Sequence, residues 1–364
     1  MDEKERLVLE LIKENPCYSQ QELSEILIIS RPELSTIISS LIKKGEMIGH
    51  GYGYVVKEHN EILAVGGANV DRKFHLEGAE QLGTSNPASV TYSVGGVARN
   101  IAENLGRLQH DVQLVTTFGQ DHDMELIKSE SASFIKFDYT EILHHETTGS
   151  YSAVLNDVGE LVIAMADMAI YDQLLPSLFN RHEVAFTKAK LIVLDLNCPK
   201  ETVRYFKRLA QVHHIPLCIV PVSVPKMKRM PKDLNGVTYF ICNQDEAEAY
   251  LSMKIKSDEH CEEACEKLRQ LGAEFVIITR GSKGVMAASS SSIKVYEAHR
   301  VTEIVDVTGA GDAFVSAFLH GMLEINNFEQ AIEFGLVNAS RTLQSNETVR
   351  QELAVDELIN WREQ

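Results

Sequence analysis

The sequence predicts an α/β protein built on a doubly wound, mainly parallel sheet. Short apolar runs typical of buried strands recur along the chain, and polar residues and a helix-compatible stretch follow each run. Four such runs are 191–197, 216–222, 238–243 and 275–279. Strands that alternate with helices in this way favour a parallel sheet covered by helices. With 364 residues, the chain is long enough for two or three domains.

The composition narrows the class of protein. The net charge of −17 disfavours bulk attraction to nucleic acid or to an anionic membrane. We find no apolar run near the roughly 20 residues that cross a bilayer, so we expect no membrane association. The six cysteines show neither metal-like nor redox-pair spacing. This pattern indicates reduced thiols and a cytoplasmic protein.

Residues 1–57 are expected to form a separate small domain. An apolar stripe begins at Leu7, and Ser19 and Glu22 have the spacing of a capping box ahead of a second helix. A third helix is predicted over Ser30–Lys44, and Met47–Val56 reads as a short hairpin. Three short helices and a β-wing resemble a winged helix-turn-helix, in which the third helix would contact DNA.

The net negative charge of residues 1–57 argues against tight DNA binding by this domain. Residues 1–57 carry nine acidic and seven basic side chains, whereas phosphate contacts supply much of the affinity for DNA. One copy of the domain should therefore bind DNA weakly. A protein-interaction or dimerisation module of the same shape remains the alternative.

The second predicted domain covers residues 58–364. Ile62–Val65 is a buried-strand pattern, and the polar segment Gly66–Asp71 comes directly after it. In open α/β sheets, functional groups lie beyond the carboxyl ends of the strands. Alternating patterns within 71–94 and 147–165 predict a smaller, half-exposed sheet.

The most informative stretch is Val305–Phe314. Gly309, Ala310 and Gly311 leave successive backbone amides uncrowded, and an apolar helical run follows. Such a helix N-terminus attracts anions. Asp312 would repel a phosphate there unless it takes a proton from the group that attacks the phosphate. The alternative is that Asp312 merely caps the helix.

Asp306-x-Thr308-Gly309-Ala310-Gly311-Asp312 resembles the C-terminal signature of the ribokinase-like (PfkB) carbohydrate and nucleoside kinases. A second segment, Gly95–Leu108, resembles the upstream signature of that family. The resemblance extends over nearly all of residues 61–364 and implies a ribokinase-like fold with a small β lid, which often also pairs subunits. It implies ATP and Mg²⁺ as well, with a likeness at Asp306 to a K⁺-binding loop.

The resemblance also assigns roles to single residues. Asp312 would be the catalytic base beside an anion hole of Gly309, Ala310 and Gly311. The positions expected to contact substrate are Asn69, Asp71, Gly96, Arg99, Asn100 and Asn197. Those expected to contact nucleotide are Asn243, Thr279, Gly281, Asn338 and Lys226. Glu246 would hold Mg²⁺ through water, although Asn243 and Glu246 fit a helix cap and a first-turn acid nearly as well.

Three features bear on the substrate. Arg99 stands where ribokinases have a small residue, although a surface salt bridge would also explain it. Asn197 stands where ribokinases place an acidic sugar ligand. The segments Gly66–Asp71 and Pro221–Lys226 resemble the pseudouridine kinase branch. Pseudouridine is therefore the favoured substrate, while inosine- or adenosine-type nucleosides and ribose stay open.

Two classes of function follow. The first is an ATP-dependent kinase that carries a regulatory DNA-binding domain and dimerises through its lid. The second is a transcriptional regulator whose kinase fold only senses a sugar or nucleoside. Asp312 favours the first class, because a sensor needs no base.

Overall fold

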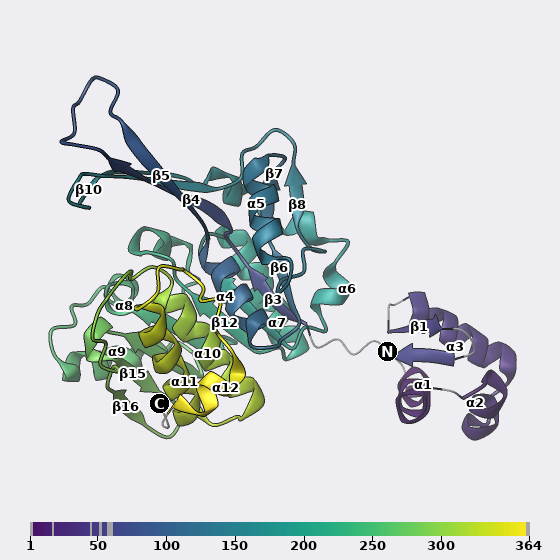
Figure 1. Cartoon of the computed structure of the whole chain (residues 1–364). Helices are drawn as coiled ribbons and strands as arrows, with labels where there is room; N and C mark the ends of the chain where they lie inside the picture. The colour runs from purple at the N-terminus through teal and green to yellow at the C-terminus, as the bar shows by residue number, and fades with distance from the viewer. Residues whose placement is uncertain (1–2, 17, 44–45, 51–52, 57–60, 362–364) are drawn as a thin grey trace. The chain divides into compact units, whose positions relative to one another are not determined.

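The computed structural model describes residues 3–16, 18–43, 46–50, 53–56 and 61–361 (Figure 1). The chain divides into two compact units. One comprises Met1–Asn60 with Glu183–Lys188, and the other Glu61–His182 with Ala189–Gln364. The expected domain boundary after residue 57 lies outside the described residues.

In the N-terminal unit, the described part of residues 1–60 contains three helices and a hairpin. They are α1 (Glu3–Glu14), α2 (Gln20–Leu27), α3 (Arg31–Lys43), β1 (Met47–His50) and β2 (Gly53–Val56), with β1 and β2 antiparallel. Ser19 and Glu22 form the expected capping box at the start of α2. Leu23, Leu34 and Leu41 are fully buried and join α2 to α3. The unit is a winged helix; the expected end of its third helix at Lys44 lies outside the described residues.

The second unit is built on an eight-stranded sheet in the order β16-β15-β14-β13-β12-β11-β3-β6. Its strands are β3 (Ile62–Val65), β6 (Val112–Val115), β11 (Leu191–Asp195), β12 (Leu217–Val220), β13 (Tyr239–Asn243), β14 (Phe275–Thr279), β15 (Val285–Ala288) and β16 (Ile293–Tyr296). The six strands from β6 to β14 are parallel, and β15 and β16 are antiparallel. The predicted doubly wound, mainly parallel sheet is confirmed.

The order of the strands locates a crevice. The chain leaves β3 for β6 on one side and later returns to β11 on the other side of β3. The connections beyond the carboxyl ends of β3 and β11 therefore diverge, and this is the place where open α/β sheets bind ligands. Gly66–Asp71 and Asp195–Asn197 lie at this point.

Helices cover the sheet. The longer ones are α4 (Val97–Arg107), α5 (His122–Ser131), α7 (Lys200–His213), α8 (Gln244–Leu251), α9 (Asp258–Gln270), α10 (Ala310–Glu324) and α11 (Phe328–Thr342). The shorter elements are β7 (Thr117–Gly119), β8 (Glu141–Leu143), α12 (Val355–Ile359) and the 3-10 turns 169–173, 176–179, 224–229 and 281–283, whereas α6 (Glu183–Phe186) belongs to the first unit. Phe314 and Phe318 of α10 enter the core beside Tyr239 of β13.

A four-stranded sheet forms the lid. Its order is β10-β9-β4-β5, with β4 (Asn69–Leu76), β5 (Ala88–Gly95), β9 (Ser150–Leu155) and β10 (Leu161–Asp167). Figure 1 shows β4 and β5 projecting beyond the larger sheet. β10 is an edge strand of this sheet, and its residues are exposed along its whole length.

Candidate active site

The N-terminus of α10 lies open as the sequence suggests. Gly309 precedes it with φ 81°, and a Cβ there would lie 2.2 Å from the Thr348 carbonyl oxygen. The first full helical bond runs from the Ala313 N–H to the Gly309 oxygen. A Cβ on Gly311 would meet nothing within 4 Å. The N–H groups of this first turn can therefore receive an anion.

Asp312 in this turn contacts Asn100 of α4. The Asn100 side-chain amide donates to Asp312 Oδ2 at 2.7 Å. Burial, together with the charge of Asp195, raises the pKa of Asp312 to about 7, although the hydrogen bond from Asn100 lowers it. A carboxyl group with such a pKa is suited to take up a proton near neutral pH.

Arg99 is buried and ion-paired rather than exposed. Its guanidinium pairs with Glu103 and donates to Ser131 Oγ at 2.9 Å. It also donates to Asn100 Oδ1 at 3.2 Å. Because this oxygen faces Arg99, the Asn100 nitrogen faces Asp312. Arg99 thus forms the salt bridge of the alternative interpretation, although in a buried and not a surface position. Its expected substrate contact stays a prediction.

Asp195, at the carboxyl end of β11, joins three segments. Its Oδ2 accepts from the backbone N–H groups of Gly67 and Ala98, both at 3.0 Å. Its Oδ1 accepts from the Asn197 N–H at 2.7 Å. Burial raises the pKa of Asp195, and these donors partly offset the rise. The carboxylate thus fixes the turn after β3 and the start of α4 in one position.

Two glycines make this approach possible. A Cβ on Gly66 would lie 2.2 Å from Asp195 Cγ, and one on Gly67 would lie 2.6 Å from the Asn197 side-chain nitrogen. Tyr171 supports the turn from below, because its hydroxyl bonds both the N–H and the carbonyl of Ala68. The Gly-Gly-Ala sequence is therefore required by close packing.

Asn69 and Asp71 lie together at the start of β4. Asn69 donates to Asp71 Oδ1 at 2.6 Å, and burial raises the pKa of Asp71 to about 6. A Cβ on Gly95 would lie 2.4 Å from Asp71 Oδ2, while Gly96 adopts φ 101°. The second oxygen of Asp71 can accept a hydrogen bond from a ligand hydroxyl.

Asp306 is held from two sides. Its Oδ1 accepts from the N–H and the hydroxyl of Thr308 at 2.9 and 2.7 Å, and its Oδ2 accepts from Lys73 Nζ at 2.8 Å. Burial opposes ionisation, but these donors outweigh it and lower the pKa of Asp306 to about 2. A K⁺ ion on this carboxylate would have to displace Lys73.

The residues expected to contact nucleotide lie on the neighbouring strands. Asn243 and Thr279 are partners in register at the ends of β13 and β14. Gly281 has φ 58°, and a Cβ there would meet nothing within 4 Å. Asn243 and Glu246 form a capping box at the start of α8, in which Glu246 Oε2 accepts from the Asn243 N–H. Burial raises the pKa of Glu246 to about 7.

Asn338 and Lys226 differ in their surroundings. Asn338 is fully buried, donates to the Ala313 carbonyl at 2.9 Å and accepts from Arg350 at 2.8 Å. These contacts weigh against the predicted adenine contact. Lys226 is half-buried; burial and the nearby Arg229 lower its pKa, while the charge of Asp195 opposes that fall. Lys226 therefore lies within electrostatic reach of the site.

Sequence reasoning assigned no role to Asp195 or Lys73. Asp195 could have been found as a carboxylate at the end of a fully apolar strand. Lys73 could have been noticed because it follows Asp71 by two positions and so shares its face of the strand.

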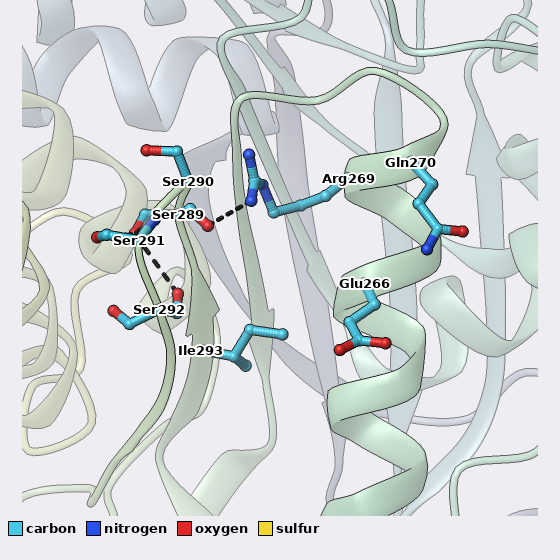
Figure 2. A pocket seen from close by; sticks show the side chains of 8 residues that line it. All are labelled: Glu266, Arg269, Gln270, Ser289, Ser290, Ser291, Ser292 and Ile293. Carbon is cyan, nitrogen blue, oxygen red and sulfur yellow. Dashed lines mark hydrogen bonds between the residues drawn. The ribbon is translucent and has the colours of Figure 1, made fainter.

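A further pocket lies away from the residues described above. A pocket of about 520 Å³ lies between α9 and the 289–293 segment, where Arg269 donates to the Ser289 carbonyl (Figure 2). Since Ala288 pairs with Val276, this pocket is near the amino end of β14, away from Thr279. Within the described ranges, no three His, Cys, Asp or Glu side chains gather as metal ligands.

Two family models match the chain. The pfkB family carbohydrate kinase model covers residues 59–353, and a winged helix-turn-helix DNA-binding model covers residues 1–45. The chain belongs to the pfkB family of carbohydrate kinases. It is accordingly a sugar or nucleoside kinase with a winged helix at its N-terminus.

Relatives match different shares of the chain. An uncharacterized sugar kinase, YeiI, of Escherichia coli is 26% identical over 99% of both chains. The pseudouridine kinase of Escherichia coli is 26% identical over 84% of this chain and 97% of its own. A guanosine-inosine kinase of Exiguobacterium acetylicum is 26% identical over 79% and 96%.

Solved structures agree on the fold. A carbohydrate kinase from Agrobacterium tumefaciens has a TM-score of 0.73 and 28% identity, over 82% of this chain and 96% of that one. Arabidopsis thaliana ribokinase, solved with ribose and ATP, also has a TM-score of 0.73, at 20% identity, over 82% and 98%. Among the helices that the structure describes, none is long and apolar enough to cross a membrane.

Proposed function

We propose that the chain transfers the γ-phosphoryl group of ATP to the 5′-hydroxyl of pseudouridine or a closely similar nucleoside, with Asp312 as base. The observation that carries the proposal is the position of Asp312, half-buried at the open N-terminus of α10, with a pKa near 7. The similarity to pseudouridine kinase and the resemblance of the Gly66–Asp71 segment support the choice of substrate.

The reaction can be followed at the residues. Asp312 accepts the proton of the attacking hydroxyl while the oxygen of that hydroxyl bonds to the γ-phosphorus and ADP leaves. The amides of Ala310, Gly311 and Asp312 receive the charge that builds on the transferred phosphoryl oxygens. Asn69, Asp71 and Asn100 hold ribose hydroxyls, because carboxylate and amide groups suit paired hydroxyls.

Mg²⁺ fits the donor set that is present. Glu246 is buried and accepts the Asn243 N–H with one oxygen. Burial, together with the charge of Asp245, raises its pKa, although the Asn243 N–H lowers it. Mg²⁺ commonly keeps its waters, so Glu246 would hold it through them. When bound, the ion neutralises phosphate charge.

The test is ADP release by the whole protein with pseudouridine, inosine, adenosine and ribose. Pseudouridine should give the highest kcat/KM, and a 5′-phosphate should be the product. Asp312→Asn should lower kcat by about 10²- to 10⁴-fold with little change in ATP affinity. The control is Asp356→Asn, an exposed position on α12. A higher kcat/KM for ribose or inosine than for pseudouridine would overturn the choice of pseudouridine as substrate. Normal turnover of Asp312→Asn would overturn the assignment of Asp312 as base.

The winged helix supports a second function, DNA binding. Its family model matches residues 1–45, and α3 exposes Arg31, Ser35, Thr36 and Ser39 on one side. These side chains can contact phosphates and base edges. Two copies on a dimer would add their contacts, which one acidic copy lacks.

The assay for DNA binding is a fluorescence anisotropy titration with duplex from the promoter upstream of the gene at low salt, with and without nucleoside. Ser35→Glu should abolish binding, whereas Ser129→Glu adds the same charge on α5 and should leave it unchanged. If Ser35→Glu and Ser129→Glu gave the same DNA titration, the proposal of DNA binding through α3 would be refuted, and only the kinase activity would remain.

Dimerisation through the lid is the third part of the proposal. Leu161, Ile163 and Met165 on β10 are 58%, 54% and 54% exposed. A row of exposed apolar side chains on an edge strand is typical of a protein–protein contact. A second copy of the chain would cover it.

A further inference from the structure

Lys73 lies in the middle of the lid sheet, where its position is fixed. Its strand, β4, pairs with β5 and β9, so that Lys73 stands in register with Thr91 on one side and Ala153 on the other. Alternate side chains of a strand share a face. Lys73 therefore shares a face with Asn69 and Asp71, the residues proposed to hold the acceptor.

From this strand the ammonium reaches the loop before α10. Lys73 Nζ lies 2.8 Å from Asp306 Oδ2, and the two side chains are 37% and 26% exposed. Such a pair is partly shielded from water, which makes its attraction stronger than that of a surface pair. The other oxygen of Asp306 already accepts two bonds from Thr308.

The loop that carries Asp306 is also held at His299, which contacts Glu333 and Trp361. Residues 297–309 belong to no helix or strand, and Ile304 and Val307 are 61% and 68% exposed. A backbone bond holds Val305 to the Leu343 carbonyl at 2.8 Å. Asp306 lies three residues before Gly309, whose φ of 81° sets the direction of the anion-binding turn. A displacement at Asp306 would therefore reach the amides of that turn.

We propose that Lys73 is a positioning residue that holds the Asp306–Gly309 turn against the acceptor-binding strand, and that its ammonium is the cation on Asp306. The carboxylate then does not fit K⁺, so turnover of this chain does not require that ion. Strand β4 carries both the acceptor ligands and Lys73. Acceptor binding and the geometry of the phosphoryl site are thereby coupled. This inference rests on the proposed phosphoryl transfer at Asp312.

The experiment compares the whole protein with Lys73→Met and Lys73→Arg. Lys294→Met is the matched control, because Lys294 also lies on a strand and pairs with Glu329 on the surface. The kcat and both KM values are measured in potassium chloride and in tetramethylammonium chloride. The acceptor is whichever compound the wild type phosphorylates best. Thermal unfolding is followed in the same two salts.

We expect the wild type to turn over equally in both salts. Lys73→Met should lose about tenfold in kcat, less than the 10²–10³ that direct loss of an anion-hole donor costs. The conservative change Lys73→Arg should lose less than Lys73→Met, and K⁺ at the freed carboxylate should recover part of the loss in Lys73→Met. Higher turnover of the wild type in K⁺ or an unchanged kcat in Lys73→Met would overturn the proposal. So would a loss that neither K⁺ nor the Lys73→Arg replacement relieves.

Thermal unfolding separates this inference from the proposed function. K⁺ should raise the unfolding temperature of Lys73→Met but not that of the wild type, since only the variant has a free Asp306 carboxylate. This readout needs no acceptor. If no tested compound is phosphorylated, the proposed function fails, while the ion-dependent shift still decides the role of Lys73. Equal shifts in both proteins would refute that role.

Discussion

Removing the amide of Asn100 should move the pH dependence of the reaction. Asn100 donates to Asp312 Oδ2 at 2.7 Å and stabilises the charged form of the carboxylate. In Asn100→Ala this donor is lost, so the pKa of Asp312 must rise from its value of about 7. Because a base acts when deprotonated, the rise in rate with pH shifts to higher pH.

The size of the shift follows from the contact. A hydrogen bond to a charged group contributes about 1.5–3 kcal/mol, and one pKa unit corresponds to about 1.4 kcal/mol. The full loss would raise the pKa by about one to two units. Water can enter the space left by the amide and donate in its place, which brings the expected shift to about one unit.

The assay is kcat/KM for the acceptor as a function of pH, because this ratio reports the pKa values of the free enzyme. The midpoint should be near pH 7 in the wild type and near pH 8 in Asn100→Ala. Asn360→Ala, an exposed position at the end of α12, should keep the wild-type midpoint. A weaker grip on the acceptor would lower kcat/KM at every pH without moving the midpoint. An unchanged midpoint, or one at lower pH, would refute the assignment of Asp312 as base.

Two further predictions concern packing. Gly66→Ala would place a Cβ 2.2 Å from Asp195 Cγ at a φ of 152°, and such overpacking costs about 1–3 kcal/mol; thermal unfolding should show it, whereas Gly78→Ala, with open space around its Cβ, should melt like the wild type. Equal melting of the two variants would contradict the close packing. Ile163→Lys should turn a dimer into a monomer in analytical ultracentrifugation, while Val295→Lys, at another exposed strand position, should not. A wild-type monomer would end the lid-dimer proposal.

The local elements follow from the sequence. The capping box at Ser19 depends on side chains three positions apart, and the buried strands on runs of four to seven residues. The open turn at Gly309 likewise follows from small residues ahead of an apolar helix. Such features depend on neighbouring residues, and a sequence displays them directly.

Tertiary structure alone decides which of these elements meet. Asn100 and Asp312 are 212 positions apart, and Lys73 and Asp306 are 233 apart. The local sequence could not separate a cap from a metal site at Asn243 and Glu246; the structure shows that the two residues form a cap, and the Mg²⁺ role of Glu246 stays a proposal. These contacts exist because strand order and helix packing bring distant side chains within reach. Local patterns such as periodicity and capping residues do not predict which distant side chains come into contact. The chemistry of the site can therefore be derived only from the folded chain.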